Sequence, residues 1–220
     1  MKSIKFINPE QHYIDEFFRI CRFIAWSYNK FLTDKVKLSK KHETFLRNVF
    51  VKKYLREFKH IHGLGYLGFE VEPGEINYED KTIGFIDIKI YNIGNPNILN
   101  EDEYYAIECK RLDGTNTKNL DYVDEGILRF VILKYSSSMP LAAMIGFVET
   151  KKISDVVVGI NHILKNHKRI VTNQMLTPKP LTEDFDQFYS SSHKRKRNLI
   201  NLYHFMFDYT TLRVSNGKKG

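Results

Sequence analysis

The spacing of apolar residues changes along the chain, from a helical period near its start to the alternation of strands in its middle. Asn8-Pro9-Glu10 has the composition of a helix start, and apolar residues then recur every three or four positions from Ile14 to Phe31. A second helical pattern starts at Ser39, carries apolar residues over 45–58 and ends before glycines at 63–68. The pattern therefore predicts two N-terminal helices followed by strands.

Two apolar runs in the middle of the chain contain charged side chains. In GFIDIKI, the three isoleucines share one face of a strand, which leaves Asp87 on the other. In YYAIECKRL, Glu108 and Lys110 share one face, and Cys109 points to the opposite, apolar face. The loop between the runs contains a glycine and a proline, which favour turns. We therefore expect a hairpin that brings Asp87 close to Glu108.

Two carboxylates that meet on neighbouring strands repel each other unless a cation lies between them. Hard oxygen ligands of this kind favour Mg²⁺ or Mn²⁺. A lysine on the same face would balance charge, orient an attacking water and stabilise a pentavalent phosphorus, as phosphodiester hydrolysis requires. Asp87, Glu108 and Lys110 therefore indicate a metal-dependent phosphodiesterase.

The order of these side chains, an acid followed by Glu108-Cys109-Lys110 on the next strand, resembles the PD-(D/E)xK nuclease superfamily. This resemblance implies an α/β fold of the restriction-endonuclease-like type, in which a mixed central sheet is flanked by helices. It implies a single nuclease-like domain over 1–220, with its core at approximately 40–150. It also implies that Asp87, Glu108 and the Cys109 carbonyl bind Mg²⁺, that Lys110 positions or deprotonates water, and that hydrolysis leaves a 5′-phosphate.

The segment after Lys110 continues with a helix and then a strand, which is the order that the resemblance implies. Residues 119–135 are predicted to be helical, and LAAMIGFV at 141–148 is predicted as a buried strand. The apolar stripe of the predicted helix consists of Leu120, Val123, Ile127, Phe130 and Val131.

Tyr122, Gly126 and Arg129 share one side of this predicted helix. In similar nuclease-like proteins a polar side of the helix borders the active site. The resemblance therefore implies that Tyr122 and Arg129 contact nucleic acid, with Arg129 at a phosphate. The alternative is a surface arginine and a tyrosine that packs on the sheet.

A further acidic residue is expected near the metal. The resemblance implies a glutamate on the helix before the hairpin, and Glu43 occupies that position as an additional catalytic residue. Glu43 also stands one turn before Arg47, so an ion pair within the helix is the alternative. Glu70, Glu72 and Glu75 immediately precede the hairpin and are rival upstream acids.

The C-terminal part of the sequence predicts one more helix and one more strand. Ser154 is expected to cap a helix with apolar residues over 156–164, and LINLYHFMFDY at 199–209 is rich in strand formers. His193 and His204 are candidate general bases, although lone histidines near aromatic strands are more often structural.

The charge of the chain favours a polyanionic partner. Its 220 residues carry a formal net charge of +8, with a sequence pI near 9.3. The basic run HKRKR is the main candidate for phosphate contacts, through Lys194, Arg195 and Arg197, and a second basic run lies at 165–169. Nuclear import is the competing interpretation of KRKR.

The composition argues against several other classes of protein. Hydrophobic residues make up 42% and charged residues 27%, which is typical of a globular protein rather than a disordered or membrane protein. The N-terminus lacks an apolar signal sequence, so we expect a cytoplasmic protein. Cys21 and Cys109 fall in apolar patterns, which predicts buried thiols rather than a disulfide or a zinc site.

Together these observations predict a Mg²⁺-dependent or Mn²⁺-dependent nuclease, an endonuclease acting on DNA. Two other functions stay open. One is an inactive nuclease fold that binds nucleic acid, and the other is an interaction subunit of a defence or mobile-element system. Because nucleases that cut both strands are commonly dimers, a homodimer is also open.

Overall fold

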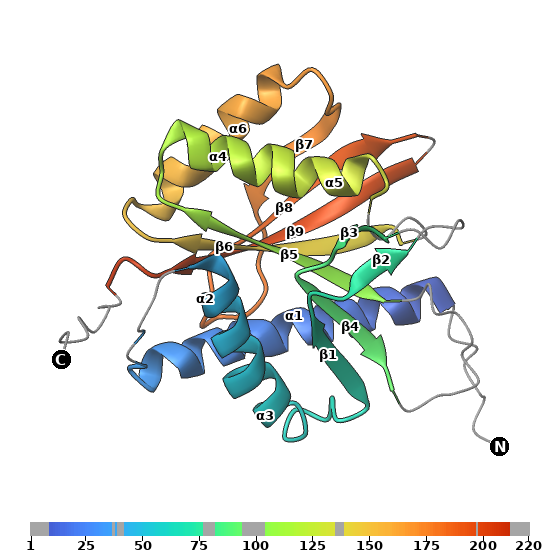
Figure 1. Ribbon diagram of the computed structural model, residues 1–220, viewed down its shortest axis with the longest axis vertical. Coiled ribbons are helices and arrows are strands. Elements are labelled where there is room, and N and C mark those ends of the chain that lie inside the picture. Colours follow the sequence, from blue (N-terminus) through green and yellow to red (C-terminus); the bar gives the residue numbers. More distant parts are fainter. Residues whose placement is uncertain are drawn as a thin grey trace.

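The computed structural model describes residues 9–36, 38, 42–76, 82–93, 104–134, 139–196 and 198–211, and it is a mixed α/β protein (Figure 1). The N-terminal helices are α1 (Pro9–Thr33), α2 (Glu43–Phe50), the π-helical η1 (Val51–Leu55) and α3 (Arg56–Phe58). The next elements are the strands β1 (Leu67–Val71), β2 (Gly74–Ile76), β3 (Thr82–Phe85), β4 (Ile88–Asn92) and β5 (Tyr105–Leu112).

A helix of three parts follows: α4 (Asn116–Tyr122), the π-helical η2 (Val123–Ile127) and α5 (Leu128–Val131). The chain then forms β6 (Leu141–Val148), α6 (Ile153–Asn166), β7 (Thr172–Pro178), β8 (Phe188–Arg195) and β9 (Asn198–Asp208). The predicted order of strand, strand, helix and strand is confirmed by β4, β5, α4–η2–α5 and β6. The predicted C-terminal strand is confirmed by β9.

In the described chain, seven strands form one mixed sheet in the order β1-β4-β5-β6-β9-β8-β7, and β2 pairs only with β3. The strand β4 is antiparallel to both β1 and β5. The central strands β5, β6 and β9 are parallel, and β8 and β7 continue the sheet in antiparallel fashion. The predicted mixed central sheet is therefore present.

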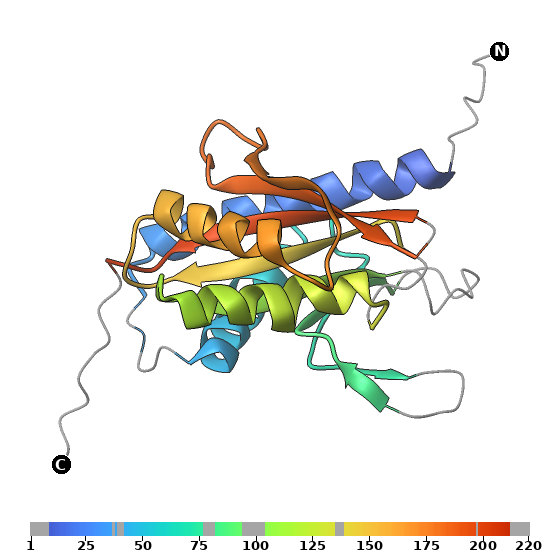
Figure 2. The ribbon, with the colours of Figure 1, turned by 90° about the horizontal axis from the view of Figure 1, so that it is seen from above.

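Helices cover both faces of this sheet. We call one face of the sheet the α1 face; there, α1 and α2–η1–α3 enclose a core that includes Phe17, Phe50 and Phe207. We call the other face the α4 face; there, α4–η2–α5 and α6 enclose a core that includes Val123 and Ile160. Figure 2 shows the sheet between α1 and α4–η2–α5. No described helix is long and apolar enough to cross a membrane.

The predicted hairpin forms, with Ile88 opposite Ile107, but the strand before it is not continuous. The chain bends at Asp87, between β3 and β4. The expectation that all three isoleucines share a face is therefore wrong: Ile88 and Ile90 pack on the α1 face, whereas Ile86 packs on the α4 face. The bend interrupts the alternation and turns Asp87 toward β5.

The helix after β5 differs from its prediction in its limits and in its buried side. It begins at Asn116 and ends at Val131, whereas 119–135 was expected. Leu120 is 40% exposed, and Asn119 is buried instead. The side chain of Asn119 lies where a Cβ on Gly159 of α6 would stand, so the two helices approach closely there.

Two helix starts also differ from the sequence prediction. The second helix begins at Glu43, after His42, and the expected start at Ser39 lies outside the described residues. In α6 the residue before the first helical turn is Lys152, so the expectation that Ser154 caps this helix is wrong. The cysteines agree with their prediction, because Cys21 and Cys109 are buried free thiols.

Candidate active site

The strand β5 continues past the last of its residues that pair with β4. Along this unpaired part of its edge, two carboxylates take the place of a neighbouring strand. Pairing between the two strands stops at Ile107. Beyond that point, Asp87 Oδ2 accepts the backbone N–H of Cys109 at 2.8 Å. Glu43 Oε2 accepts the backbone N–H of Arg111 at 2.9 Å. These two acids therefore satisfy edge groups of β5 and are held beside its charged residues.

The ammonium of Lys110 lies among oxygens of the three predicted metal ligands. Its Nζ is 2.8 Å from Glu108 Oε1, 3.0 Å from the Cys109 carbonyl oxygen and 3.8 Å from Asp87 Oδ2. Glu43 Oε1 lies 3.5 Å from the same nitrogen. Because Asp87 Oδ2 and Glu108 Oε1 both lie close to this nitrogen, the two carboxylates also lie close to each other. The predicted convergence of the acids and the lysine is present.

Burial sets the protonation of this cluster. Glu108 is 1% exposed, and burial, together with the charge of Asp87, raises its pKa to about 7 although Lys110 acts in the opposite direction. Burial also acts to lower the pKa of Lys110, but the surrounding carboxylates outweigh it and raise this pKa above its ordinary value. Lys110 is therefore a cation at neutral pH, while Glu108 is poised between its two forms.

Arg129 approaches the cluster from α5, on the α4 face. Its Nη1 donates to Glu108 Oε1 at 2.8 Å, and its guanidinium also pairs with Glu125 one helical turn earlier. Gly126, on the same side of the helix, lets it approach, because a Cβ there would stand 3.9 Å from Lys110 Cγ and would overlap Met144. The expected shared side of Gly126 and Arg129 is therefore turned toward the charged cluster.

Arg47 belongs to the cluster, although the sequence suggested it only as an alternative partner of Glu43. It is 1% exposed, it pairs with Asp87, and its Nη2 lies 3.0 Å from Glu72. Burial acts to lower the pKa of Arg47, but the charge of Asp87 and the hydrogen bond to Glu72 raise it overall. Glu43 and Arg47 are four residues apart on α2 and therefore share one side of the helix. This spacing was the sequence signal that could have indicated that both face the hairpin.

Among the upstream acids, Glu43 is the one that reaches Lys110. Glu72 is 53% exposed at its side chain and is bound by Arg47. Glu70 is exposed on β1, and the side chain of Glu75 lies outside the described part of the chain. The geometry therefore favours Glu43 over Glu70 and Glu72.

The oxygens of the cluster fit a hard divalent cation. Oε2 of Glu108 is buried and has no hydrogen-bond partner among the described residues, which is the state expected of a carboxylate oxygen reserved for a cation. In the described part of the chain, no three His, Cys, Asp or Glu side chains form a ready metal-binding group. The ammonium of Lys110 lies between the carboxylates of Asp87 and Glu108. A metal ion would have to displace it.

The predicted nucleic-acid contacts divide into three groups. Tyr122 is fully buried, with its hydroxyl 2.8 Å from His204 Nδ1, and Arg195 is 5% exposed and donates to two backbone carbonyls. The expectation that these two side chains contact nucleic acid is therefore wrong, because both are buried. Lys194 is exposed, as its prediction requires, and Arg197 lies outside the described residues.

The two histidines considered as general bases form a buried network instead. Ser191 Oγ lies 2.8 Å from His193 Nε2 and 2.8 Å from His204 Nε2. Burial lowers the pKa of His193 to about 4 and that of His204 to about 3. Both histidines are therefore neutral and closed to substrate, as their structural interpretation requires.

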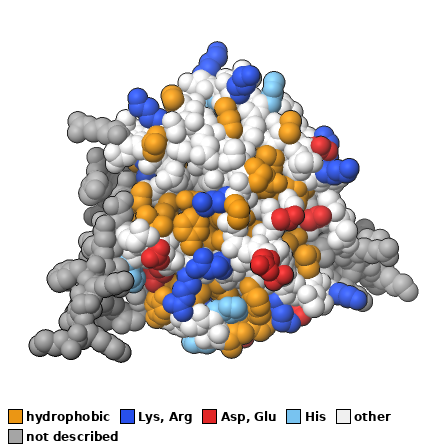
Figure 3. Space-filling view, turned by 180° about the vertical axis from the view of Figure 1, so that it is seen from behind, with side chains coloured by type: hydrophobic (Ala, Val, Ile, Leu, Met, Phe, Trp, Pro, Cys, Tyr) orange, Lys and Arg blue, Asp and Glu red, His pale blue; other side chains and the backbone are white. Residues whose placement is uncertain are grey.

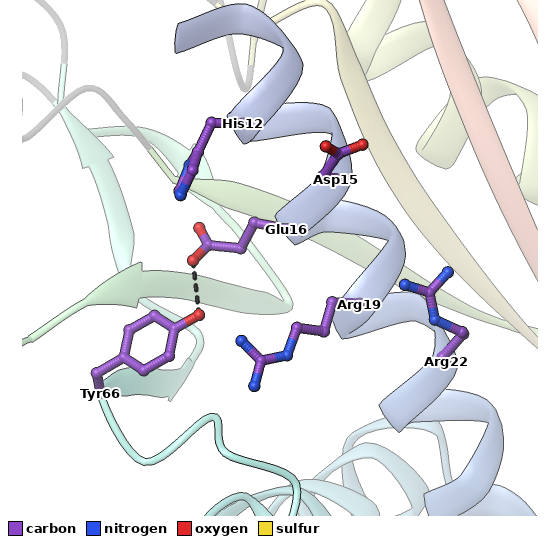
Figure 4. Close-up of a pocket in the computed structure, with 6 residues that line it drawn as sticks. All are labelled: His12, Asp15, Glu16, Arg19, Arg22 and Tyr66. Atoms are coloured by element: carbon purple, nitrogen blue, oxygen red, sulfur yellow. Dashed lines mark hydrogen bonds between the residues drawn. The ribbon is translucent and has the colours of Figure 1, made fainter. Parts of the chain in front are cut away.

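A separate pocket of about 310 Å³ lies along α1, on the opposite face of the sheet from Glu108 (Figure 4). In Figure 4, Glu16 points toward the hydroxyl of Tyr66, and the two arginines of the pocket extend from later turns of the same helix. The Glu16 carboxylate also accepts from Tyr105 at 2.8 Å. The Glu16 carboxylate is thus already hydrogen-bonded within the fold, and the pocket takes no part in the charged cluster.

The chain was compared with protein-family models, with curated proteins and with solved structures, and none of them matches it.

Proposed function

We propose that the protein is a Mg²⁺-dependent or Mn²⁺-dependent nuclease of the PD-(D/E)xK type, with a restriction-endonuclease-like fold. The observation that carries this proposal is the position of the Lys110 ammonium. It lies among oxygens of Asp87, Glu108 and the Cys109 carbonyl, the three groups that the resemblance assigns to the metal. Oε2 of Glu108 has no hydrogen-bond partner among the described residues, and it is a fourth oxygen that could coordinate the ion.

In this proposal Asp87, Glu108 and the Cys109 carbonyl hold the ion, which supplies Lewis acidity toward the phosphate when it is bound. Lys110 acts as a cation that orients water and balances developing charge. Its raised pKa argues against removal of a proton from water by this side chain. Arg129, which donates to Glu108 from α5, would contact a phosphate oxygen of the substrate.

The test compares the wild-type protein with Glu108→Gln and Asp87→Asn on linear, circular and single-stranded DNA and on RNA, with a panel of divalent ions. We expect cleavage with Mg²⁺ or Mn²⁺, and a loss of at least about 100-fold in both variants. Glu16→Gln is the matched control, because its carboxylate is also hydrogen-bonded but lies on the α1 side of the sheet. Cleavage at the wild-type rate by both site variants would refute the assignment.

One observation favours the second candidate function, a nuclease-like fold that binds nucleic acid without cutting it. The ammonium of Lys110 already fills the space between the carboxylates. If that ion pair is too stable to be displaced, no divalent ion will enter. This function predicts salt-sensitive binding of nucleic acid, no cleavage with any ion, and no Mn²⁺ binding by calorimetry.

A further inference from the structure

Two basic runs that are far apart in the sequence lie side by side at the end of β7 and β8. Thr172 pairs with His193, and the backbone N–H of Lys194 donates to the carbonyl of Val171 at 2.8 Å. Arg169 precedes Val171 by two residues, and Lys196 follows Lys194 by two, and both side chains are exposed. The described parts of the two runs, 165–169 and 193–196, therefore come together at this end of β7 and β8.

Alternation along β8 decides which side chains of the second run face outward. Ser191, His193 and Arg195 point to the α4 face and are buried there. Arg195 donates to the carbonyls of Phe130 and Met139, both at 2.9 Å, and so fastens β8 to the end of α5. Lys194 and Lys196 are exposed. The inward arginine thus fixes the strand whose lysines face solvent.

The outward side of β8 and of the neighbouring part of β9 is polar and has no acidic side chain. In register across the two strands, Ser190 lies opposite Tyr203, Ser192 opposite Asn201 and Lys194 opposite Leu199. The hydroxyl of Ser192 is buried and has no partner among the described residues. We call the surface formed by Arg169, Ser190, Lys194 and Lys196 the β8 surface; Ser192 is only 5% exposed and is not part of it.

Its cations have no carboxylate partner in the described part of the chain. Arg169, Lys194 and Lys196 make no ion pair with any described carboxylate, whereas Lys30, Lys118 and Arg111 elsewhere are each paired. In Figure 3, the upper part of this side of the molecule carries several Lys and Arg side chains among uncharged ones, and most of the acidic side chains lie nearer its middle. The surface is complementary to a polyanion.

We infer that the β8 surface binds the phosphate backbone of duplex nucleic acid, independently of base sequence. Cations and hydroxyl groups are the donors that contact phosphates, and base readout is not expected from short serines and flexible lysines. The three cations of the surface are not interleaved with exposed aromatic rings, which binding of single strands by stacking would require. Duplex is therefore favoured over single strands.

This site is separate from the charged cluster. Glu108 is in register with His204 through β6, and Lys194 is in register with Leu199. Five residues along β9 and three strand spacings across the sheet place the two sites roughly 20 Å apart. Lys194 also points away from the face that carries Glu108. Binding at the β8 surface therefore requires neither a metal ion nor an intact cluster.

The experiment measures binding of a labelled 20-base-pair duplex by fluorescence anisotropy in EDTA, over a range of salt concentrations. The test variant is Lys194→Glu with Lys196→Glu. The control variant is Lys52→Glu with Lys53→Glu, which changes two exposed lysines on η1 and gives the same net charge. We expect the test variant to bind at least about 10-fold more weakly than the control at moderate salt. Its log–log salt slope should fall by about two, roughly 0.9 for each lost phosphate contact.

Equal weakening in the two variants would overturn the inference, because it would show an effect of net charge alone. Tighter binding of a single strand than of the duplex would also overturn it. Lys194→Gln with Lys196→Gln removes the charges without introducing acids, and it should show about half of the loss on the logarithmic scale. Because EDTA prevents cleavage, this assay measures binding independently of the proposed activity. A protein that binds here through Lys194 but cuts nothing in the divalent-ion panel would refute the nuclease proposal and support this one.

Discussion

Replacing Glu108 by glutamine should make the protein more stable at alkaline pH while it abolishes the proposed activity. Glutamine has the shape of the protonated acid and still offers an oxygen to Lys110. It removes only the charge that burial disfavours. Glu108 is 1% exposed, and its pKa is raised from an ordinary 4.5 to about 7. The folded protein therefore carries a cost for ionising this carboxyl that the unfolded chain does not.

The magnitude follows from linkage. Between pH 4.5 and pH 7 the folded state holds the Glu108 proton more tightly than the unfolded state, so the stability contributed by this group is lost as pH rises through about 7. A shift of this size corresponds to about 3 kcal/mol. Glu108→Gln lacks this loss. The difference in unfolding free energy, variant minus wild type, should therefore increase by about 3 kcal/mol between pH 4 and pH 8.

The assay is urea unfolding at several pH values in EDTA, followed by circular dichroism. Comparison with the variant cancels the titration of the other groups, and Glu16→Gln supplies a control on the opposite side of the sheet. Addition of Mn²⁺ should reverse the sign at pH 8, because only the wild-type carboxylate gains from the ion. A difference between variant and wild type that stays constant from pH 4 to pH 8 would contradict the reasoning.

Two further changes test the fold around the site. Tyr122→Phe should lower the free energy of unfolding by about 1–3 kcal/mol, because it leaves the buried Nδ1 of His204 without its hydroxyl partner. Chemical unfolding at pH 7 measures this change, and an unchanged midpoint would show that the bond contributes nothing. The lowered pKa values of His193 and His204, about 4 and about 3, mean that the unfolded chain takes up protons first. The stability that these two histidines contribute should therefore be complete above pH 6.5 and be lost as pH decreases below it, a trend opposite in sign to that of Glu108. Gly146→Ala should lower the free energy of unfolding by about 1–3 kcal/mol, since the added Cβ would stand 2.5 Å from Leu112 Cδ1 in the centre of the sheet. Thermal unfolding measures this change, and a variant as stable as wild type would show that β6 can shift.

Alternation along β5 was sufficient to predict the charged half of the site. A strand buried on both faces must place residues two apart on the same side, so Glu108 and Lys110 had to share a face once β5 was identified. The apolar run at 141–148 was equally informative, because only a central strand with helices on both faces is buried at every position. These features depend on local periodicity, which a single sequence contains.

The remaining features depend on contacts between distant segments. Nothing in GFIDIKI signals that the chain bends at Asp87, because the bend is stabilised by bonds from Arg47 and from the Cys109 backbone. Arg195 lies in a run of five basic residues, and only the approach of α5 makes it the buried member. Periodicity cannot reveal either case, since the partner lies at least 20 residues away.

The bend at Asp87 and the charge cluster have the same physical origin. Had β4 continued along β5, its backbone would have taken the N–H groups of Cys109 and Arg111, and no carboxylate would have been drawn to that edge. Because β4 begins only at Ile88, after the bend, those N–H groups are bound by Asp87 and Glu43 instead. With Glu108, the two acids fixed there raise the pKa of Lys110, and Asp87 adds to the burial that raises the pKa of Glu108. The local departure from regular structure thus creates the electrostatic cost that a divalent ion would relieve, as expected of a functional site.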